Sequence, residues 1–175
     1  MSKESRGLIL LYTGNGKGKT TAAIGTVFRA LGHGMRVGVI QFIKGKWRTG
    51  ERKLGEQTPN LTWLTMGRGF TWESEDLARD REMAISAWQT ARGWLEGGDF
   101  DLVVLDEITY AANYGFVSAG EIVTALGSRR QGLHVILTGR AAPAELVAAA
   151  DLVTEMRAVK HPYREGVTAQ KGIEF

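Results

Sequence analysis

The sequence predicts an α/β fold with a mostly parallel central sheet and helices on both faces. Several short runs are apolar throughout, which is typical of strands that are buried on both faces of a sheet. Segments with helical periodicity separate these runs, and this alternation favours a parallel sheet with right-handed crossovers. The length of 175 residues corresponds to about one domain. We therefore expect residues 1–175 to form a single domain.

Strands are expected wherever the chain is apolar without alternation. Four such runs give a strong signal, and two others give a weaker one. The strong runs are Leu8–Tyr12, Val37–Phe42, Leu102–Leu105 and Val135–Leu137, and the weaker runs are Leu61–Met66 and Leu152–Met156.

Helices are expected between the strands. The first candidate is rich in alanine and ends at a glycine-rich stop. In the longest candidate, Ser74 can act as the N-cap, and an apolar face runs from Leu77 to Leu95. The four predicted helices are Thr20–Leu31, Ser74–Leu95, Ser118–Leu126 and Ala144–Ala149.

The stretch Lys44–Asn60 has no clear periodicity and carries five basic side chains, the outermost being Lys44 and Lys53. We expect it to be a long irregular loop. Loops of this length are often functional, but a solvated surface loop is an equally good interpretation.

Composition and charge exclude several classes of protein. The chain has no Cys, which excludes disulfides, thiolate metal sites and Cys nucleophiles. The net charge of +3 is mild for a nucleic-acid module, and the longest early apolar run is far shorter than the ~20 residues that span a bilayer. We expect neither a nucleic-acid nor a membrane partner. The polar N-terminus lacks a signal-peptide pattern, which favours a cytoplasmic location. The three His residues are too scattered for a metal cluster and are expected at structural or surface positions, namely His33, His134 and His161.

The most specific local motif is the octapeptide Thr13-Gly14-Asn15-Gly16-Lys17-Gly18-Lys19-Thr20. It follows an apolar strand and opens a helix, as a P-loop requires. Backbone amides can surround phosphate oxygens, Lys19 adds a positive charge, and the Thr20 hydroxyl can bind Mg²⁺. Thr13 stands where the pattern has Gly, and Gly14 can absorb the turn. Thr21 either contacts phosphate or packs.

A second motif complements the first. The run Leu102–Leu105 ends in two carboxylates, Asp106 and Glu107. In a P-loop fold we expect this strand to lie beside Leu8–Tyr12 and to deliver an acid to Mg²⁺. Taken alone, the two acids could simply be solvated. Together the motifs predict a nucleotide-binding, P-loop NTPase-like (RecA-like) domain.

The chain resembles the P-loop type of corrinoid adenosyltransferases. The resemblance runs nearly from end to end, and the segments beyond the P-loop make it specific. The matching segments are Thr13–Thr21, Gln41–Gly45, Gly69–Trp72, Leu105–Glu107, Thr138–Arg140, Val159–Tyr163 and Gln170–Ile173.

The resemblance implies an enzyme that transfers the 5′-deoxyadenosyl group of ATP to the Co(I) of cobalamin or a precursor, and releases triphosphate. It further implies Mg²⁺ as the cofactor, with Mn²⁺ as an alternative, a reduced flavoprotein as electron donor, and a homodimer. The catalytic residues would be Lys19, Glu107, Phe70 and Trp72, where the two aromatics lie beneath the corrin and keep the lower axial ligand off cobalt. Without the resemblance, these aromatics would be assigned to a small satellite core.

Further residues are implied for the nucleotide and the metal. Arg140 resembles a residue near the nucleotide, with a structural ion pair as the alternative. Lys160 and His161 belong either to the nucleotide pocket or to the anchoring of the tail. The implied binding residues are Gly14, Asn15, Gly16, Lys17, Gly18, Lys19, Thr20, Thr21 and Arg140, and the implied metal ligands are Thr20, Asp106 and Glu107.

Other functions share parts of this pattern. A RecA-like ATPase module would use Glu107 to polarise a water, and a small-molecule kinase would want an Arg-rich lid. A nucleotide-sensing module without catalysis is a third alternative. Both the ATPase and the kinase would produce ADP, whereas the transferase releases triphosphate.

Overall fold

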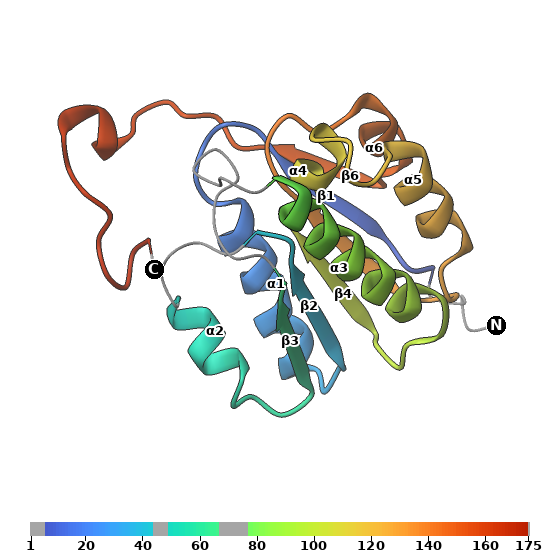
Figure 1. The fold of residues 1–175 in the computed structure, drawn as a ribbon. Coiled ribbons are helices and arrows are strands. Elements are labelled where there is room, and N and C mark those ends of the chain that lie inside the picture. The colour runs from blue at the N-terminus through green and yellow to red at the C-terminus, as the bar shows by residue number, and fades with distance from the viewer. Residues whose placement is uncertain (1–5, 44–48, 67–76, 175) are drawn as a thin grey trace.

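A six-stranded sheet, with every neighbouring pair parallel, forms the centre of the computed structural model, which describes residues 6–43, 49–66 and 77–174 (Figure 1). The prediction of a mostly parallel sheet is therefore confirmed. All six predicted strands are present. Their bounds are β1 Ile9–Thr13, β2 Val37–Gln41, β3 Leu61–Thr65, β4 Leu102–Asp106, β5 His134–Thr138 and β6 Leu152–Glu155.

The strand order is β3-β2-β4-β5-β1-β6. The expectation that β4 lies beside β1 is wrong, because β5 separates them: Leu11 pairs with Leu137, and Leu137 pairs with Leu105. The order of parallel strands depends on how the crossovers pack, which short apolar runs do not specify. The carboxyl end of β5 consequently lies between the P-loop and the acids.

Helices cover both faces of the sheet, as predicted. Alternate side chains of each strand point to opposite faces. Leu11, Leu105 and Leu137 pack with the helices of one face, and Val104 and Ile136 pack with α1 on the other. The helices are α1 Lys19–Gly32 on one face, and α3 Leu77–Gly97, α4 Ile108–Asn113, α5 Ala119–Ser128 and α6 Ala144–Ala149 on the other.

Two short helices were not predicted. α2 (Gly50–Gly55) lies inside the stretch Lys44–Asn60, so this stretch is not irregular throughout, and α4 directly follows Glu107. Each has six residues, too few to show a helical period. In α3, the predicted apolar face is buried from Ala84 to Leu95, but Leu77 is 56% exposed. The predicted cap Ser74 lies outside the described residues.

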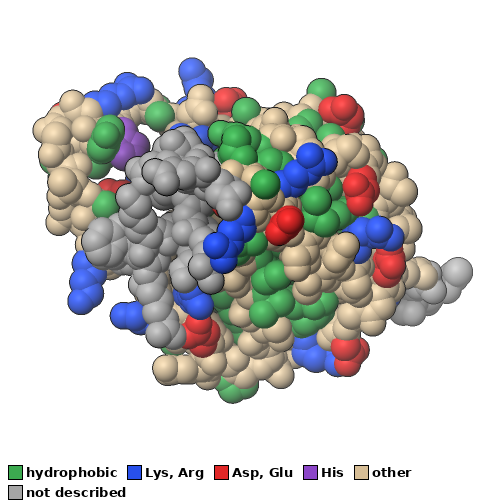
Figure 2. All heavy atoms as spheres, viewed as in Figure 1, with side chains coloured by type: hydrophobic (Ala, Val, Ile, Leu, Met, Phe, Trp, Pro, Cys, Tyr) green, Lys and Arg blue, Asp and Glu red, His purple; other side chains and the backbone are tan. Residues whose placement is uncertain are grey.

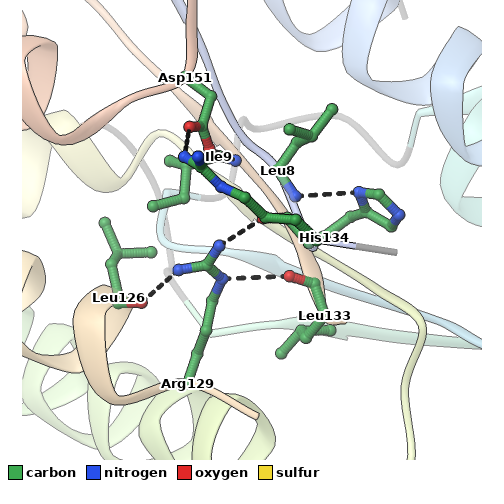
Figure 3. A network of polar contacts seen from close by, with 9 residues as sticks. Leu8, Ile9, Leu126, Arg129, Leu133, His134 and Asp151 are labelled. Carbon is green, nitrogen blue, oxygen red and sulfur yellow. Dashed lines mark hydrogen bonds and ion pairs between the residues drawn. The ribbon is translucent and has the colours of Figure 1, made fainter. Parts of the chain in front are cut away.

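A network of hydrogen bonds connects the amino ends of β1 and β5 (Figure 3). The Arg129 guanidinium donates hydrogen bonds to the carbonyl oxygens of Gly7, Leu126 and Leu133. The backbone N–H of Leu8 donates to His134 Nδ1 at 3.1 Å. These bonds hold the segment before β1 against β5 and α5. They give His134 and Arg129 structural roles at the sheet edge opposite the P-loop.

The surface in Figure 2 carries mixed charge. Over α3 and α5, Lys and Arg side chains alternate with Asp and Glu, whereas basic side chains gather along the C-terminal tail. Within the described ranges, no helix combines the length and apolarity needed to cross a membrane.

Candidate active site at the carboxyl edge of the sheet

The P-loop lies at the carboxyl edge of the sheet, between β1 and α1. Gly14 has a φ of 96°, a conformation that side chains other than glycine rarely adopt. The N–H of Gly16 donates to the carbonyl oxygen of Met156 at 2.6 Å, and a Cβ on Gly16 would lie 2.7 Å from that oxygen. The glycines are therefore needed for the turn and for close contact with the chain after β6. Gly14 absorbs the turn beside Thr13, as predicted.

The Lys19 side chain folds back into this loop. Its Nζ donates hydrogen bonds to the carbonyl oxygens of Gly14 at 2.9 Å and Gly16 at 2.8 Å. Lys19 is only 7% exposed. Burial lowers the pKa of its ammonium, the charge of Glu107 opposes this shift, and the charge of Arg140 adds to it. A buried cation at a helix N-terminus is suited to bind phosphate oxygens.

Asp106 ends β4 and accepts hydrogen bonds from three elements. Its Oδ1 accepts from the hydroxyls of Thr20 at 2.9 Å and Thr138 at 2.7 Å, and its Oδ2 accepts from Gln41 Nε2 at 3.1 Å. Asp106 is 4% exposed. Because the Thr20 hydroxyl gives its hydrogen to Asp106, its lone pairs remain available for a cation.

Glu107 directly follows β4 and has a φ of 60°, which is uncommon for a residue other than glycine. Burial raises the pKa of its carboxyl group and the charge of Asp106 adds to this, whereas Lys19 and Arg140 oppose it. A carboxylate that burial and a like charge destabilise gains from a nearby cation. The strained backbone and the raised pKa both point to a functional position.

The residues present fit a divalent cation that prefers oxygen. The Thr20 hydroxyl bonds to the Asp106 carboxylate beside the phosphate loop, and the Glu107 carboxyl group lies close enough to interact electrostatically with both Asp106 and Lys19. Mg²⁺ typically binds one or two carboxylates together with substrate phosphates. The residues predicted as metal ligands are therefore brought together with the predicted phosphate ligands.

Arg140 follows the end of β5 and is exposed. Its charge acts on both Lys19 and Glu107, so its guanidinium lies in the electrostatic field of the same site. Its carbonyl oxygen accepts hydrogen bonds from Thr109 Oγ1 at 2.8 Å and Asn113 Nδ2 at 3.2 Å. α4 thereby holds the loop that carries Arg140.

A cavity of about 610 Å³ opens beside this site. Its lining includes Thr20, Thr21 and Asp106, the outward face of α1, and tail residues 172–174. Of the other loop positions, Asn15 is exposed, and Lys17 forms an ion pair with Glu174 of the tail. The tail therefore returns to the P-loop.

Four further candidates are not found at this site among the described residues. Lys160 pairs with Glu165 at 3.2 Å, and His161 Nδ1 accepts from the N–H of Tyr163 at 3.2 Å, so both have contacts within the tail. Phe70 and Trp72 lie outside the described residues, as do the first basic residues of the stretch from Lys44.

Gln41 and Thr138 belong to the site but were not among the predicted site residues. Gln41 ends β2, Thr138 ends β5, and both contact Asp106. A polar residue at the end of an apolar strand was the available signal, since ligands bind outside the carboxyl ends of parallel strands.

Comparisons with known proteins agree with this geometry. The model of the family "ATP:corrinoid adenosyltransferase BtuR/CobO/CobP" matches residues 5–175. A corrinoid adenosyltransferase of Pseudomonas aeruginosa is 45% identical over 175 residues, covering 99% of this chain and 86% of that protein. Corrinoid adenosyltransferase CobA of Salmonella typhimurium is 45% identical over 174 residues, covering 99% and 88%.

A solved structure shows the same fold at low identity. The flagellar accessory protein FlaH of Methanocaldococcus jannaschii aligns with a TM-score of 0.59 at 8% identity, over 86% of this chain and 71% of that one. Such a likeness concerns the fold alone. The family model and the full-length relatives, by contrast, match the chain together with its site, and the chain belongs to the ATP:corrinoid adenosyltransferase family.

Proposed function

We propose that this adenosyltransferase uses its P-loop to bind the triphosphate of ATP as a leaving group while the Co(I) of a corrinoid attacks the ribose C5′. The Co–C5′ bond forms with the electron pair of Co(I). The bond between C5′ and the triphosphate oxygen breaks, and triphosphate leaves with the electron pair of that broken bond. No phosphoryl group is transferred, and no proton needs to move.

The P-loop residues stabilise the charge that develops on the triphosphate. Lys19 and the backbone amide of Gly18 are donors held in place before the reaction, and preorganised donors of this kind are usually the largest catalytic contribution. Arg140 adds positive charge at the same edge. Asn15, Lys17 and Thr21 line the approach to the phosphates.

Mg²⁺, or Mn²⁺ as an alternative, would be held by Thr20, Asp106 and Glu107, and Asp106 also orients the threonine hydroxyl. When bound, the cation neutralises negative charge on the triphosphate. The donors support this assignment, because all are oxygens and two of them are carboxylates at a buried site.

Phe70 and Trp72 are proposed to lie beneath the corrin and to keep the lower axial ligand off cobalt, which makes Co(II) easier to reduce and excludes water. We further propose a reduced flavoprotein as the electron donor, and a homodimer in the cytoplasm in which residues 1–175 form one catalytic domain. These assignments rest on the family resemblance.

The observation that carries the proposal is the hydrogen bond between the Thr20 hydroxyl and Asp106, because it joins the phosphate loop and the acidic strand end in one site. The test is incubation of the protein with ATP, Mg²⁺ and chemically reduced corrinoid. We expect the Co(I) spectrum to disappear as triphosphate forms. Release of ADP without adenosylation would instead identify an ATPase or a kinase.

A further inference from the structure

Thr138 occupies the position where the P-loop half and the acidic half of the site meet. It ends β5, and β5 lies between β1, which carries the P-loop, and β4, which carries the acids. Thr138 is fully buried. A hydroxyl in such a place requires hydrogen-bond partners, because a buried polar group without them is costly.

Both partners of this hydroxyl are acidic residues of the site. Thr138 Oγ1 lies 2.7 Å from Asp106 Oδ1 and 2.9 Å from the backbone nitrogen of Glu107. An N–H can only donate, so Oγ1 accepts from Glu107, and its single hydrogen is then given to Asp106. One side chain thus orients the carboxylate of one acid and the backbone of the other.

Each bond acts on a feature that metal binding would require. Asp106 Oδ1 also accepts from the Thr20 hydroxyl, so Thr138 helps to set the carboxylate that turns the lone pairs of Thr20 outward. Glu107 has a φ of 60°, a conformation that persists only where the surroundings hold it. The bond from its N–H to Thr138 is one such restraint.

We propose that Thr138 is a positioning residue for the metal and triphosphate site, in which its hydroxyl sets Asp106 and Glu107 at once. The inference rests on the proposed metal role of Thr20, Asp106 and Glu107. Thr138 itself touches neither metal nor substrate. It acts through the two acids, and its loss should reduce the contribution of the metal to ATP binding.

The test is calorimetric titration of ATP into the whole protein, once with excess EDTA and once with saturating Mg²⁺. The ratio of the two Kd values gives the metal contribution. Thr138→Val keeps the shape and removes the hydroxyl, so we expect this contribution to fall by about tenfold or more, as for hydrogen bonds to charged groups. The Kd in EDTA should stay unchanged.

Two variants serve as controls. Thr138→Ser restores the hydroxyl and should recover most of the metal contribution. Thr124→Val removes a hydroxyl that donates within α5 to the carbonyl oxygen of Gly120 at 2.8 Å, and should behave as wild type. Thr138→Ala removes the same hydroxyl with less bulk, and it replaces the valine variant if circular dichroism shows that valine disturbs folding.

The outcomes separate the two levels of the proposal. If the hydroxyl-free variants keep the wild-type metal contribution, or if serine loses as much as valine, Thr138 has no positioning role and the metal site stands. If wild type itself binds ATP equally well with and without Mg²⁺, the metal assignment fails and this inference fails with it.

Discussion

Lys19 is a buried cation whose ammonium lies within hydrogen-bonding distance of two carbonyl oxygens of its own loop. If it stabilises the leaving triphosphate, Lys19→Ala should lower turnover by about 10²–10³-fold, as for the loss of one preorganised donor. Adenosylation of pre-reduced corrinoid measures this. Arg92→Ala removes an exposed cation on α3 and should leave the rate unchanged. A Lys19→Ala enzyme of nearly normal activity would contradict the role of the P-loop.

Glu107 is expected to destabilise the metal-free protein at neutral pH. Its carboxyl pKa is raised by burial and by Asp106. In the pH range between the ordinary glutamate pKa and this raised pKa, the folded protein therefore binds a proton that the unfolded chain has released. Stability therefore falls as pH rises from the ordinary glutamate pKa through the folded-state pKa. Glu107→Gln should raise the Tm of the metal-free protein at pH 7, and the difference should vanish at low pH.

The same substitution should act in the opposite direction on metal binding. Glutamine keeps the shape and removes the charge, so Glu107→Gln should weaken Mg²⁺·ATP binding while the fold stays intact. Titration of activity against Mg²⁺ measures this effect. An unchanged Mg²⁺ dependence would leave the metal role to Asp106 and Thr20.

Phe70→Ala and Trp72→Ala test the proposed displacement of the axial ligand. Both variants should be severely slowed with Co(II)-cobalamin and a flavoprotein reductant, but should recover most activity with pre-reduced Co(I), which has already lost that ligand. Some loss of activity should remain in every assay, because each substitution removes apolar contact surface worth about 1–3 kcal/mol. Equal losses with Co(II) and Co(I) substrates would mean that these aromatics only pack.

At the scale of secondary-structure elements, Gln41 joins the carboxyl ends of three strands. From β2 it donates to Asp106 on β4, and its Oε1 accepts from Trp63 Nε1 and Thr65 Oγ1 on β3, each at 3.2 Å. Gln41→Leu would leave these three partly buried groups without that partner. We expect a loss of about 1–3 kcal/mol in the free energy of unfolding, together with lower activity, and denaturation in urea measures the first.

A double-mutant cycle isolates the hydrogen bond between Trp63 on β3 and Gln41 on β2. Trp63→Phe removes the N–H that Gln41 accepts and keeps an aromatic ring. The losses from Gln41→Leu and Trp63→Phe should therefore overlap in the double variant, because contacting residues are not additive. Fully additive losses would show that the hydrogen bond between Gln41 and Trp63 contributes nothing to stability.

At the scale of the whole molecule, the C-terminal tail returns across the carboxyl edge to the P-loop, where Glu174 pairs with Lys17 (Figure 1). Its last described residues line the 610 Å³ cavity, although Ile173 is 83% exposed. Truncation after Lys171 should therefore leave the Tm unchanged, because none of the described residues beyond Lys171 belongs to the core. It should raise the KM for a substrate by about fivefold, as for lost contacts worth roughly 1 kcal/mol.

The control for the tail is Val159→Ala, which changes an exposed tail residue (91%) away from the cavity lining. It should leave both KM values as in wild type. If truncation changes neither the KM for ATP nor that for the corrinoid, the tail is not a wall of the substrate site.

Local signals in the sequence were enough to predict the strands, the main helices and the P-loop. A run such as Val37–Phe42 is driven to bury its apolar side chains inside the protein, whatever the fold around it. The turn at Gly14 and the charges at Lys19, Asp106 and Glu107 are likewise properties of a few consecutive residues. These features could be read without knowing which segments meet in space.

The tertiary structure alone decided which strand lies beside which. The insertion of β5 between β1 and β4 follows from how the crossover helices pack on both faces, and this involves residues far apart in the chain. That order places Thr138 between the P-loop and the acids, and Gln41 on the other side of Asp106. A Thr or Gln at the end of an apolar strand shows only that the position is polar, because its role comes from the neighbours that the sheet provides.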